Sequence, residues 1–375
     1  MSITVAISGI NAADNPGPGT GIARSLKECG RDVRTIGFAY DSMEPGIFMD
    51  WTIDKAYIMP WPSCTPEDYL ARLAYVHAKE AIDVIIPALD VEIPLYLRLR
   101  SQLAKMGIRI MLPEAEAFAV RDKSKLGELA PRIGLKLPGT LVMKSPDDLH
   151  EAAAKFGFPM MVKGPFYEAA KAYTLGDAYK AFYEYAAKWG YPIIAQEYVS
   201  GEEYNIIGLG DGKGRDMGHV AIKKMLVTKA GKIWTNVSIR NEPIFRAAEA
   251  FVKTVKWAGG FELEMIQKAG TQDLYLIEIN PRFPAWVYMA TGCGVNLPDR
   301  LVCSLLDLPY RTDSEYAAGK VLIRYTGETI RSMADFAKLA VEGESHDAED
   351  KPLPAAGGDV MPAGTGSNHQ LTGNP

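Results

Sequence analysis

The stretch from Leu274 to Phe283 most strongly constrains how this chain can fold, because it alternates like a β-strand and then ends in polar residues. It reads Leu-Tyr-Leu-Ile-Glu-Ile-Asn-Pro-Arg-Phe, so Glu278, Asn280 and Arg282 occupy every second position. Side chains two residues apart in a strand lie on the same face of a sheet. The pattern therefore predicts a carboxylate, an amide and a guanidinium side by side at the end of a rigid strand.

A second acidic strand is predicted just upstream, at residues 260–266, where Glu262 and Glu264 share a face. The spacing between the two strands fits a hairpin, which would make Glu264 a third ligand beside Glu278 and Asn280. Carboxylate and amide oxygens suit octahedral Mg²⁺, and a neighbouring arginine suits a phosphate or carboxylate that the metal also touches. The pair of strands thus indicates nucleotide chemistry. The alternative is that these acids are ordinary solvent-facing residues of an antiparallel sheet.

Length and composition agree with a large soluble enzyme. A chain of 375 residues should divide into two or three lobes, and 47% apolar with 23% charged residues can bury full cores. A formal charge of −5 argues against nucleic-acid or anionic-membrane partners. The N-terminus lacks a charged leader ahead of an apolar run, and no apolar stretch is long enough to cross a bilayer. We therefore expect a cytoplasmic protein with no membrane partner.

Cysteines and histidines are scattered along the chain and predict neither a metal centre nor a catalytic base. The cysteines show no zinc spacing, so we expect them to be reduced and buried. They are Cys29, Cys64, Cys293 and Cys303, and the histidines are His77, His150, His219, His346 and His369.

The first 113 residues predict an open parallel sheet with helices between its strands. Strands are expected at residues 3–8, 33–38, 83–87 and 108–112, with helices at 22–29 and 94–106. Gly17-Pro-Gly-Thr-Gly21, followed by Asp41, resembles a dinucleotide-binding fingerprint. However, its spacing is GxGxG and not GxGxxG, and the first turn is too long. Nicotinamide or flavin binding is therefore disfavoured.

The sequence Glu-Ile-Asn-Pro-Arg-Phe, with the acidic strand before it and Ala-Thr-Gly-Cys-Gly-Val-Asn-Leu-Pro after it, resembles the metal-binding end of the ATP-grasp superfamily. The resemblance is strongest to the large subunit of carbamoyl-phosphate synthetase and its single-module relatives. It implies an α/β and α+β fold in which a Rossmann-like pre-ATP-grasp domain, residues 1–113, precedes an ATP-grasp domain, residues 114–344. The latter would divide into lobes at 114–196 and 197–344, the second lobe carrying the metal site. Residues 345–375 are rich in glycine and proline, lack aromatic residues and are expected to be a disordered tail.

The resemblance also implies a set of nucleotide-binding residues. Lysines near the start of the module and at the end of an apolar strand would contact phosphates, a hinge would meet the adenine, and an acid would hold the ribose hydroxyls. Lys223 and Lys224 point to opposite sides of one strand, so at most one faces the cleft. The residues assigned to the nucleotide are Lys123, Lys163, Gln196, Glu197, Tyr198, Val199, Glu203 and Lys223. Glu203 fits the ribose acid best and Glu197 second, although Lys123 could be a solvated helix lysine and the acids an ordinary charged loop.

One feature departs from the family pattern. A glycine-rich loop usually follows the lysine equivalent to Lys163, whereas here the sequence is Gly164-Pro-Phe-Tyr-Glu-Ala-Ala-Lys-Ala-Tyr173, with a single glycine. Lys171 could supply charge that backbone amides supply elsewhere.

The implied activity is that of an ATP-dependent carboxylate–amine (or thiol) ligase that works through an acyl phosphate, with ATP and Mg²⁺ or Mn²⁺ as cofactors. Arg282 would hold the acyl phosphate by bidentate contact, and Arg240 could reach the same group. Substrates would be a small acid and an amine, with a peptide or carrier-bound substrate and a homodimer also compatible. The alternative is a regulatory or scaffold protein that binds ATP or ADP with reduced catalysis, which the glycine-poor loop favours.

Overall fold

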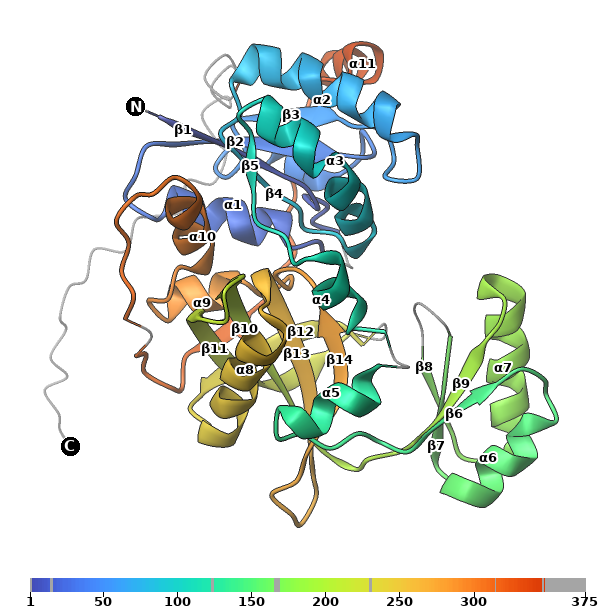
Figure 1. The fold of residues 1–375 in the computed structure, drawn as a ribbon. Helices are drawn as coiled ribbons and strands as arrows, with labels where there is room; N and C mark the ends of the chain where they lie inside the picture. The colour runs from blue at the N-terminus through green and yellow to red at the C-terminus, as the bar shows by residue number, and fades with distance from the viewer. Residues whose placement is uncertain are drawn as a thin grey trace, which may run out of the picture.

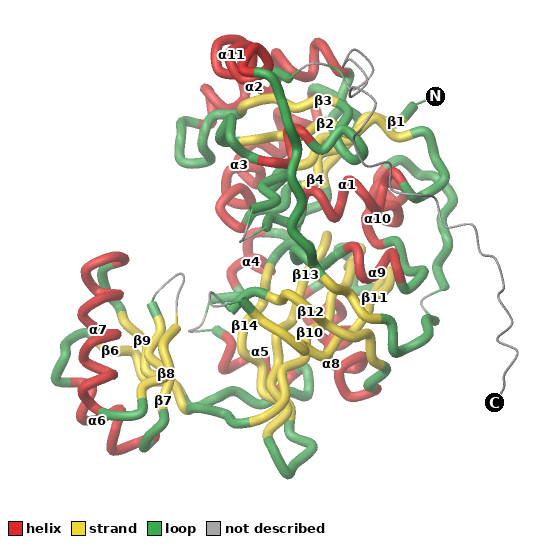
Figure 2. The backbone as a smooth tube through the Cα atoms, turned by 180° about the vertical axis from the view of Figure 1, so that it is seen from behind, coloured by secondary structure: helices red, strands yellow, loops and turns green. Residues whose placement is uncertain are grey.

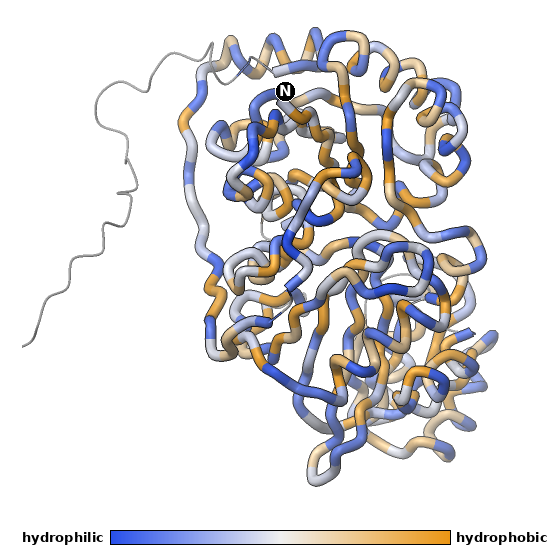
Figure 3. Tube along the Cα trace, turned by 60° about the vertical axis from the view of Figure 1, so that its left-hand side comes forward, coloured by the Kyte–Doolittle hydropathy of each residue, from blue (hydrophilic) through white to orange (hydrophobic). Residues whose placement is uncertain are grey.

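The computed structural model of the chain describes residues 2–13, 16–122, 125–164, 169–228, 231–313, 315–345 and 347. Within these residues, three β-sheets occupy three parts of the molecule, and each is covered by its own helices (Figure 1). Hydrophobic and hydrophilic stretches alternate along the chain throughout the body (Figure 3). In the described part of the chain, every helix is too short or too polar to traverse a bilayer.

The N-terminal part is a five-stranded parallel sheet in the order β3-β2-β1-β4-β5. Val5 and Ile7 point to the face covered by α1, whereas Ala6 points to the face covered by α2 and α3. Because both faces are buried, the strands are almost continuously apolar. The strand order reverses between β1 and β4, so loops that leave these strands diverge at their carboxyl ends. The strands are β1 Ile3–Ile7, β2 Val33–Ala39, β3 Lys55–Ile58, β4 Val84–Ile86 and β5 Arg109–Ile110; the helices are α1 Gly19–Lys27, η1 Pro45–Phe48, α2 Pro66–Glu80, η2 Asp90–Glu92 and α3 Ile93–Lys105.

Two short helices, α4 Ala115–Ala119 and α5 Leu126–Arg132, lead to a four-stranded antiparallel sheet in the order β6-β9-β7-β8. Helices α6 and α7 cover one face of this sheet, and the other face is turned toward the main body (Figures 1 and 2). Helix α7 begins where Thr174 and Asp177 form a reciprocal capping box. The elements are β6 Thr140–Met143, α6 Asp148–Phe156, β7 Met160–Lys163, β8 Ala169–Ala172, α7 Leu175–Trp189 and β9 Ile193–Glu197.

The largest sheet has six strands in the order β14-β13-β10-β11-β12-β15 and is antiparallel throughout. Helix α8 packs on one face, beginning at the Asn241 cap with Pro243 in its first turn. Helices α9 and α10 pack against α1 and so join this sheet to the parallel one. The elements are β10 Gly201–Asp211, β11 Asp216–Val227, β12 Ile233–Ile239, α8 Glu242–Val255, β13 Ala258–Lys268, β14 Leu274–Asn280, α9 Tyr288–Gly292, α10 Leu297–Leu305 and β15 Val321–Ile323.

After β15 the chain returns to the parallel sheet through α11, Met333–Glu342, which lies near β3 (Figures 1 and 2). The Ser345 N–H donates to the Ala56 carbonyl oxygen at 2.8 Å, and Glu344 forms an antiparallel bridge with Tyr57. Residues 343–345 therefore lie along the outer edge of β3. Residues 348–375, most of the predicted tail, are outside the described residues.

Candidate functional site

The two acidic strands pair as the sequence predicted. In the β13–β14 hairpin Glu264 lies opposite Glu278, and Glu262 lies opposite Asn280. All four side chains therefore emerge on one face of the six-stranded sheet. A register shift after Glu264 marks the point where the ladder becomes irregular. The face carries three carboxylates and one amide, which is an oxygen-rich set of the kind that Mg²⁺ requires.

Hydrogen bonds hold most of this set in place. Asn280 Nδ2 donates to Glu262 Oε2 at 2.8 Å and to Glu264 Oε1 at 3.0 Å. Glu262 also accepts from Asn205 Nδ2 at 2.6 Å and from Trp286 Nε1 at 2.7 Å. Burial, together with the neighbouring Glu264 carboxylate, raises the pKa of Glu262 well above its usual range. Glu262 is buried and Glu264 is half-buried, and two carboxylates kept this close favour a cation between them. Glu278 is exposed and leaves the set open to solvent.

A lysine already neutralises part of the negative charge of these carboxylates. Lys224 Nζ on β11 lies 2.9 Å from both Glu203 Oε2 and Glu264 Oε2. Burial would raise the pKa of Glu264, but Lys224 and Asn280 lower it below its ordinary value. The sequence analysis assigned Lys223 to the nucleotide and allowed only one of the two lysines to face the cleft, and the structure places Lys224 on the face that carries Glu264. Lys223 points to the other side of the strand and pairs with Glu202.

Arg282 connects β14, the strand that carries Glu278 and Asn280, to the parallel sheet. Its Nε lies 2.9 Å from Asp90 Oδ1, in η2 after β4, and its Nη1 lies 3.9 Å from Glu262 Oε2. Arg121 Nη1 contacts the other oxygen of Asp90 at 3.3 Å. Burial alone would lower the pKa of Arg282, but the carboxylates of Asp90 and Glu262 raise it. Arg282 is therefore a fixed cation beside the acidic face, and Asp90 is a partner that the sequence pattern did not reveal.

Arg240, the other predicted catalytic arginine, follows the end of β12 and is exposed. Its Nη1 lies 3.5 Å from the carbonyl oxygen of Tyr316, and its guanidinium lies 6.0 Å from the ring centres of Phe245 and Tyr316. The interactions that fix Arg282 and Arg240 are thus separate from each other.

The predicted hinge runs from the end of β9 to the start of β10. Gln196 Nε2 donates to Thr140 Oγ1 at 3.2 Å, and Glu197 accepts from the Gly139 N–H through Oε2 at 3.0 Å. The Glu197 side chain therefore binds the backbone just before β6, whereas the Glu203 side chain pairs with Lys224. Tyr198 lies under Lys171, whose Nζ is 3.7 Å from the ring centre, and Val199 is buried.

Lysines of the four-stranded sheet lie on the face turned toward the main body. Lys171 is registered opposite Met161, which also pairs with Gln196, so these residues share the face that α6 and α7 leave open. Lys163 ends β7 two residues after Met161 and lies on the same face. Lys123 and residues 165–168 of the glycine-poor loop fall outside the described residues, and the phosphate contact of Lys123 stays a prediction.

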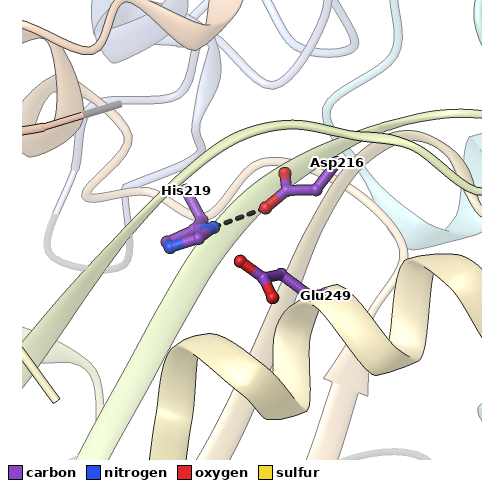
Figure 4. Close-up of side chains that lie close together, drawn as sticks. All are labelled: Asp216, His219 and Glu249. Atoms are coloured by element: carbon purple, nitrogen blue, oxygen red, sulfur yellow. Dashed lines mark hydrogen bonds and ion pairs between the residues drawn. The ribbon is translucent and has the colours of Figure 1, made fainter. Parts of the chain in front are cut away.

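A histidine group that the sequence did not predict lies on the opposite face of the six-stranded sheet. His219 Nδ1 lies 2.5 Å from Asp216 Oδ2, and Glu249 of α8 approaches both (Figure 4). The ligand-type atoms of the three residues lie within 4.8 Å of one another. The His219 ring also packs 4.7 Å from that of Phe245. Strand parity separates this group from Lys224, so it is not part of the acidic face described above.

Comparisons with known proteins show similarity to ATP-grasp enzymes and to carbamoyl-phosphate synthases. Residues 191–327 match the family "ATP-grasp in the biosynthetic pathway with Ter operon". The chain is 24% identical over 307 residues to a carbamoyl-phosphate synthase of Methanobrevibacter smithii, covering 76% of this chain and 80% of that protein. It is also 24% identical over 250 residues to the carbamoyl phosphate synthase large chain of Thermotoga neapolitana, but that match covers 62% of this chain and only 21% of the large chain.

A solved structure shares the fold. The biotin carboxylase domain of the Hydrogenobacter thermophilus 2-oxoglutarate carboxylase, in complex with MgADP, ADP and bicarbonate, aligns with a TM-score of 0.63 and 15% identity. The alignment covers 84% of this chain and 73% of that domain. Residues 191–327 therefore resemble an ATP-grasp family, and the chain as a whole is similar in sequence to carbamoyl-phosphate synthases and in fold to a biotin carboxylase domain.

Proposed function

We propose that the chain is an ATP-dependent ligase that joins a carboxylate to an amine or thiol through an acyl phosphate, releasing ADP and phosphate. The observation that carries the proposal is the pairing of Glu264 with Glu278 and of Glu262 with Asn280, beside Arg282. These carboxylate and amide oxygens are suited to bind a cation, and the Arg282 guanidinium is held in place beside them. A protein that only bound a nucleotide would have no chemical reason to keep Arg282 against these acids.

Glu264, Glu278 and Asn280 fit Mg²⁺ and would hold it. When bound, Mg²⁺ neutralises charge that develops on phosphate oxygens during phosphoryl transfer. Gln196 to Val199 would meet the adenine edge and Glu203 the ribose, while Lys123, Lys163 and Lys171 would contact phosphates. In this structure Glu203 is shared with Lys224, so ribose binding by Glu203 would compete with that ion pair.

The reaction requires no side-chain nucleophile. A carboxylate oxygen of the acid attacks the γ-phosphorus of ATP, so an oxygen–phosphorus bond forms and the bond to the ADP oxygen breaks. The amine nitrogen then attacks the acyl carbon, the carbon–oxygen bond to phosphate breaks with its electron pair, and the nitrogen loses a proton. Arg282 would hold the phosphoryl group throughout, because its planar guanidinium matches two oxygens at once.

Small acids are the proposed donors, because the described structure offers charged and polar groups at this face. The solved relative named above contains bicarbonate, which makes bicarbonate the first acid to test. A peptide or carrier-bound substrate and a homodimer are part of the same proposal.

The test is ADP release from MgATP with a panel of acids that includes bicarbonate, amino acids and dipeptides, each with and without ammonia or an amine. We expect one acid to raise ADP release and Glu278→Gln to abolish that response. Lys223→Met is the matched control, because Lys223 lies on the opposite side of the sheet. If MgATP binds but every acid and amine of the panel leaves ADP release unchanged, a ligase for small acids is excluded, and the protein either acts on a carrier-bound acid or is a nucleotide-binding regulator.

A further inference from the structure

Arg324 lies directly after β15, on the face of the six-stranded sheet that carries Lys224. The backbone N–H of Arg324 donates to the backbone carbonyl oxygen of Trp234 at 3.1 Å, so the pairing of β15 with β12 continues to this residue. Leu322 is registered opposite Asn236, and Arg324 follows Leu322 by two positions. Arg324 and Asn236 are therefore diagonal neighbours on one face, at a separation that a long side chain spans.

The Arg324 side chain has no partner among the described residues. It is partly buried, its Nε is shielded from solvent, and that nitrogen donates to no oxygen in the described structure. Burial lowers the pKa of Arg324, and no carboxylate opposes this effect. Arginines that lose hydration inside proteins are normally paired with an anion, because an uncompensated buried charge is strongly unfavourable.

Asn236, on the neighbouring strand β12, also has buried polar atoms without a hydrogen-bond partner among the described residues. It is 0% exposed, and within the described residues neither its Nδ2 nor its Oδ1 has a hydrogen-bond partner. Buried amides are almost always satisfied by protein, ligand or ordered water. Asn236 is also registered directly opposite Lys224, the residue that contacts Glu264. The unsatisfied Asn236 amide thus lies between the unpaired Arg324 guanidinium and the face of the sheet that carries Glu262, Glu264 and Glu278.

We propose that Arg324 and Asn236 form an oxyanion-binding subsite of the ligase. The inference rests on the proposed function and deepens it, because it assigns the anionic end of a reactant to named residues. Lys224 is already neutralised by two carboxylates, so Arg324 supplies the positive charge that an incoming anion would meet. A guanidinium binds a carboxylate or phosphate through two parallel hydrogen bonds, and the Asn236 Nδ2 adds a third donor. The bound group is either the carboxylate of the acid substrate or a phosphate of the nucleotide.

Thermal unfolding tests the subsite without turnover. Sodium bicarbonate and sodium phosphate are the probes, and sodium chloride at equal ionic strength is the reference. We expect at least one probe to raise the Tm of the unaltered protein by a few degrees, and Arg324→Met to remove the rise. Asn236→Leu should reduce it. Arg311→Met is the matched control, because the Arg311 side chain is 82% exposed and its loss should leave the response intact.

A second prediction separates a binding role from a structural one. Without added anions, Arg324→Met should melt no lower than the unaltered protein, because it removes a charge that has no partner. If Arg324→Met lowers the Tm in chloride, or if the probes stabilise it as much as the unaltered protein, the subsite proposal is wrong. It is also wrong if neither probe stabilises the unaltered protein.

The source of the oxyanion follows from titration calorimetry and ADP release. If the anion is the acid, Arg324→Met should raise the KM for that acid at least tenfold and leave the MgATP affinity unchanged. If it is a nucleotide phosphate, the same variant should weaken MgATP at least tenfold. Both results keep the subsite. A protein that binds the probes through Arg324 but turns over no acid would retain the subsite and refute the ligase proposal instead.

Discussion

Two adjacent lysines of β11 occupy opposite environments, and their contrast shows which charges the acidic face depends on. The Lys224 side chain is 11% exposed between Glu203 and Glu264, whereas the Lys223 side chain beside Glu202 is 38% exposed. Lys224→Met would leave both carboxylates without their cation. We expect this variant, unfolded by urea without Mg²⁺, to lose about 3 kcal/mol of unfolding free energy, since breaking a buried pair is costly. Lys223→Met should lose less than about 1 kcal/mol, as exposed pairs do.

The same experiment with Mg²⁺ adds a sharper criterion. A divalent cation bound by Glu264 would replace part of the missing charge, so Mg²⁺ should recover more stability in Lys224→Met than in Lys223→Met. Equal losses in the two variants would show that Lys224 is not the cation on which this face relies.

At the scale of elements, the period-two alternation of residues predicted which side chains share a face within the β13–β14 hairpin. It did not predict which side chains of separate strands lie together. The period-two pattern gave the shared face of Glu278 and Asn280, and the hairpin register confirms their pairing with the upstream acids. The choice between Lys223 and Lys224 could not be made in this way, because β11 has residues packed on both faces over much of its length and periodicity does not say which face is which. Asp90, Asn236 and Arg324 come from three different elements, so only tertiary structure brings them to the acidic face.

The return of the chain to β3 is a second long-range feature. The Gly343 carbonyl accepts from the Ile58 N–H at 2.8 Å and from Arg72 Nη2 at 2.6 Å, and Ser345 bonds Ala56 through both its N–H and its hydroxyl. The sequence placed the start of the tail at Ser345, because glycine and proline enrichment marks composition and not the last residue that pairs with a sheet. This segment supplies hydrogen-bond partners to an otherwise open strand edge.

Two truncations measure what the segment contributes. A chain that ends at Asp347 keeps all of these bonds, and we expect its thermal unfolding to match that of the full chain. A chain that ends at Glu342 loses them, and each bond contributes about 1 kcal/mol. We expect a loss of about 4 kcal/mol from these four bonds and a Tm several degrees lower. If both truncations melt alike, residues 343–347 do not stabilise the parallel sheet.

At the scale of the whole molecule, a half-buried ion pair joins the parallel sheet to the end of the strand that carries Glu278 and Asn280. Asp90 follows β4, at the edge where the strand order reverses, and Arg282 follows β14. Loops at this edge are the usual place for ligands in parallel sheets. The pair therefore sets the position of Arg282 relative to the parallel sheet. Asp90 touches Arg282 and not the metal-type residues, so its role in catalysis would be one of positioning.

Asp90→Asn removes the charge and preserves the size of the side chain. Arg282 should then shift toward Glu262, the remaining carboxylate in reach at 3.9 Å. Because small misplacements of a catalytic group are costly, we expect kcat for acid-dependent ADP release to fall about tenfold or more. The Kd for MgATP should change less than about threefold, since the strand residues proposed to hold Mg²⁺ are unchanged. Asp50→Asn is the control, because Asp50 pairs with Arg331 at 2.7 Å, away from the acidic face, and should leave both constants unaltered. A variant that loses MgATP affinity in proportion to kcat would show that Asp90 supports the fold of the site as a whole and does not position Arg282.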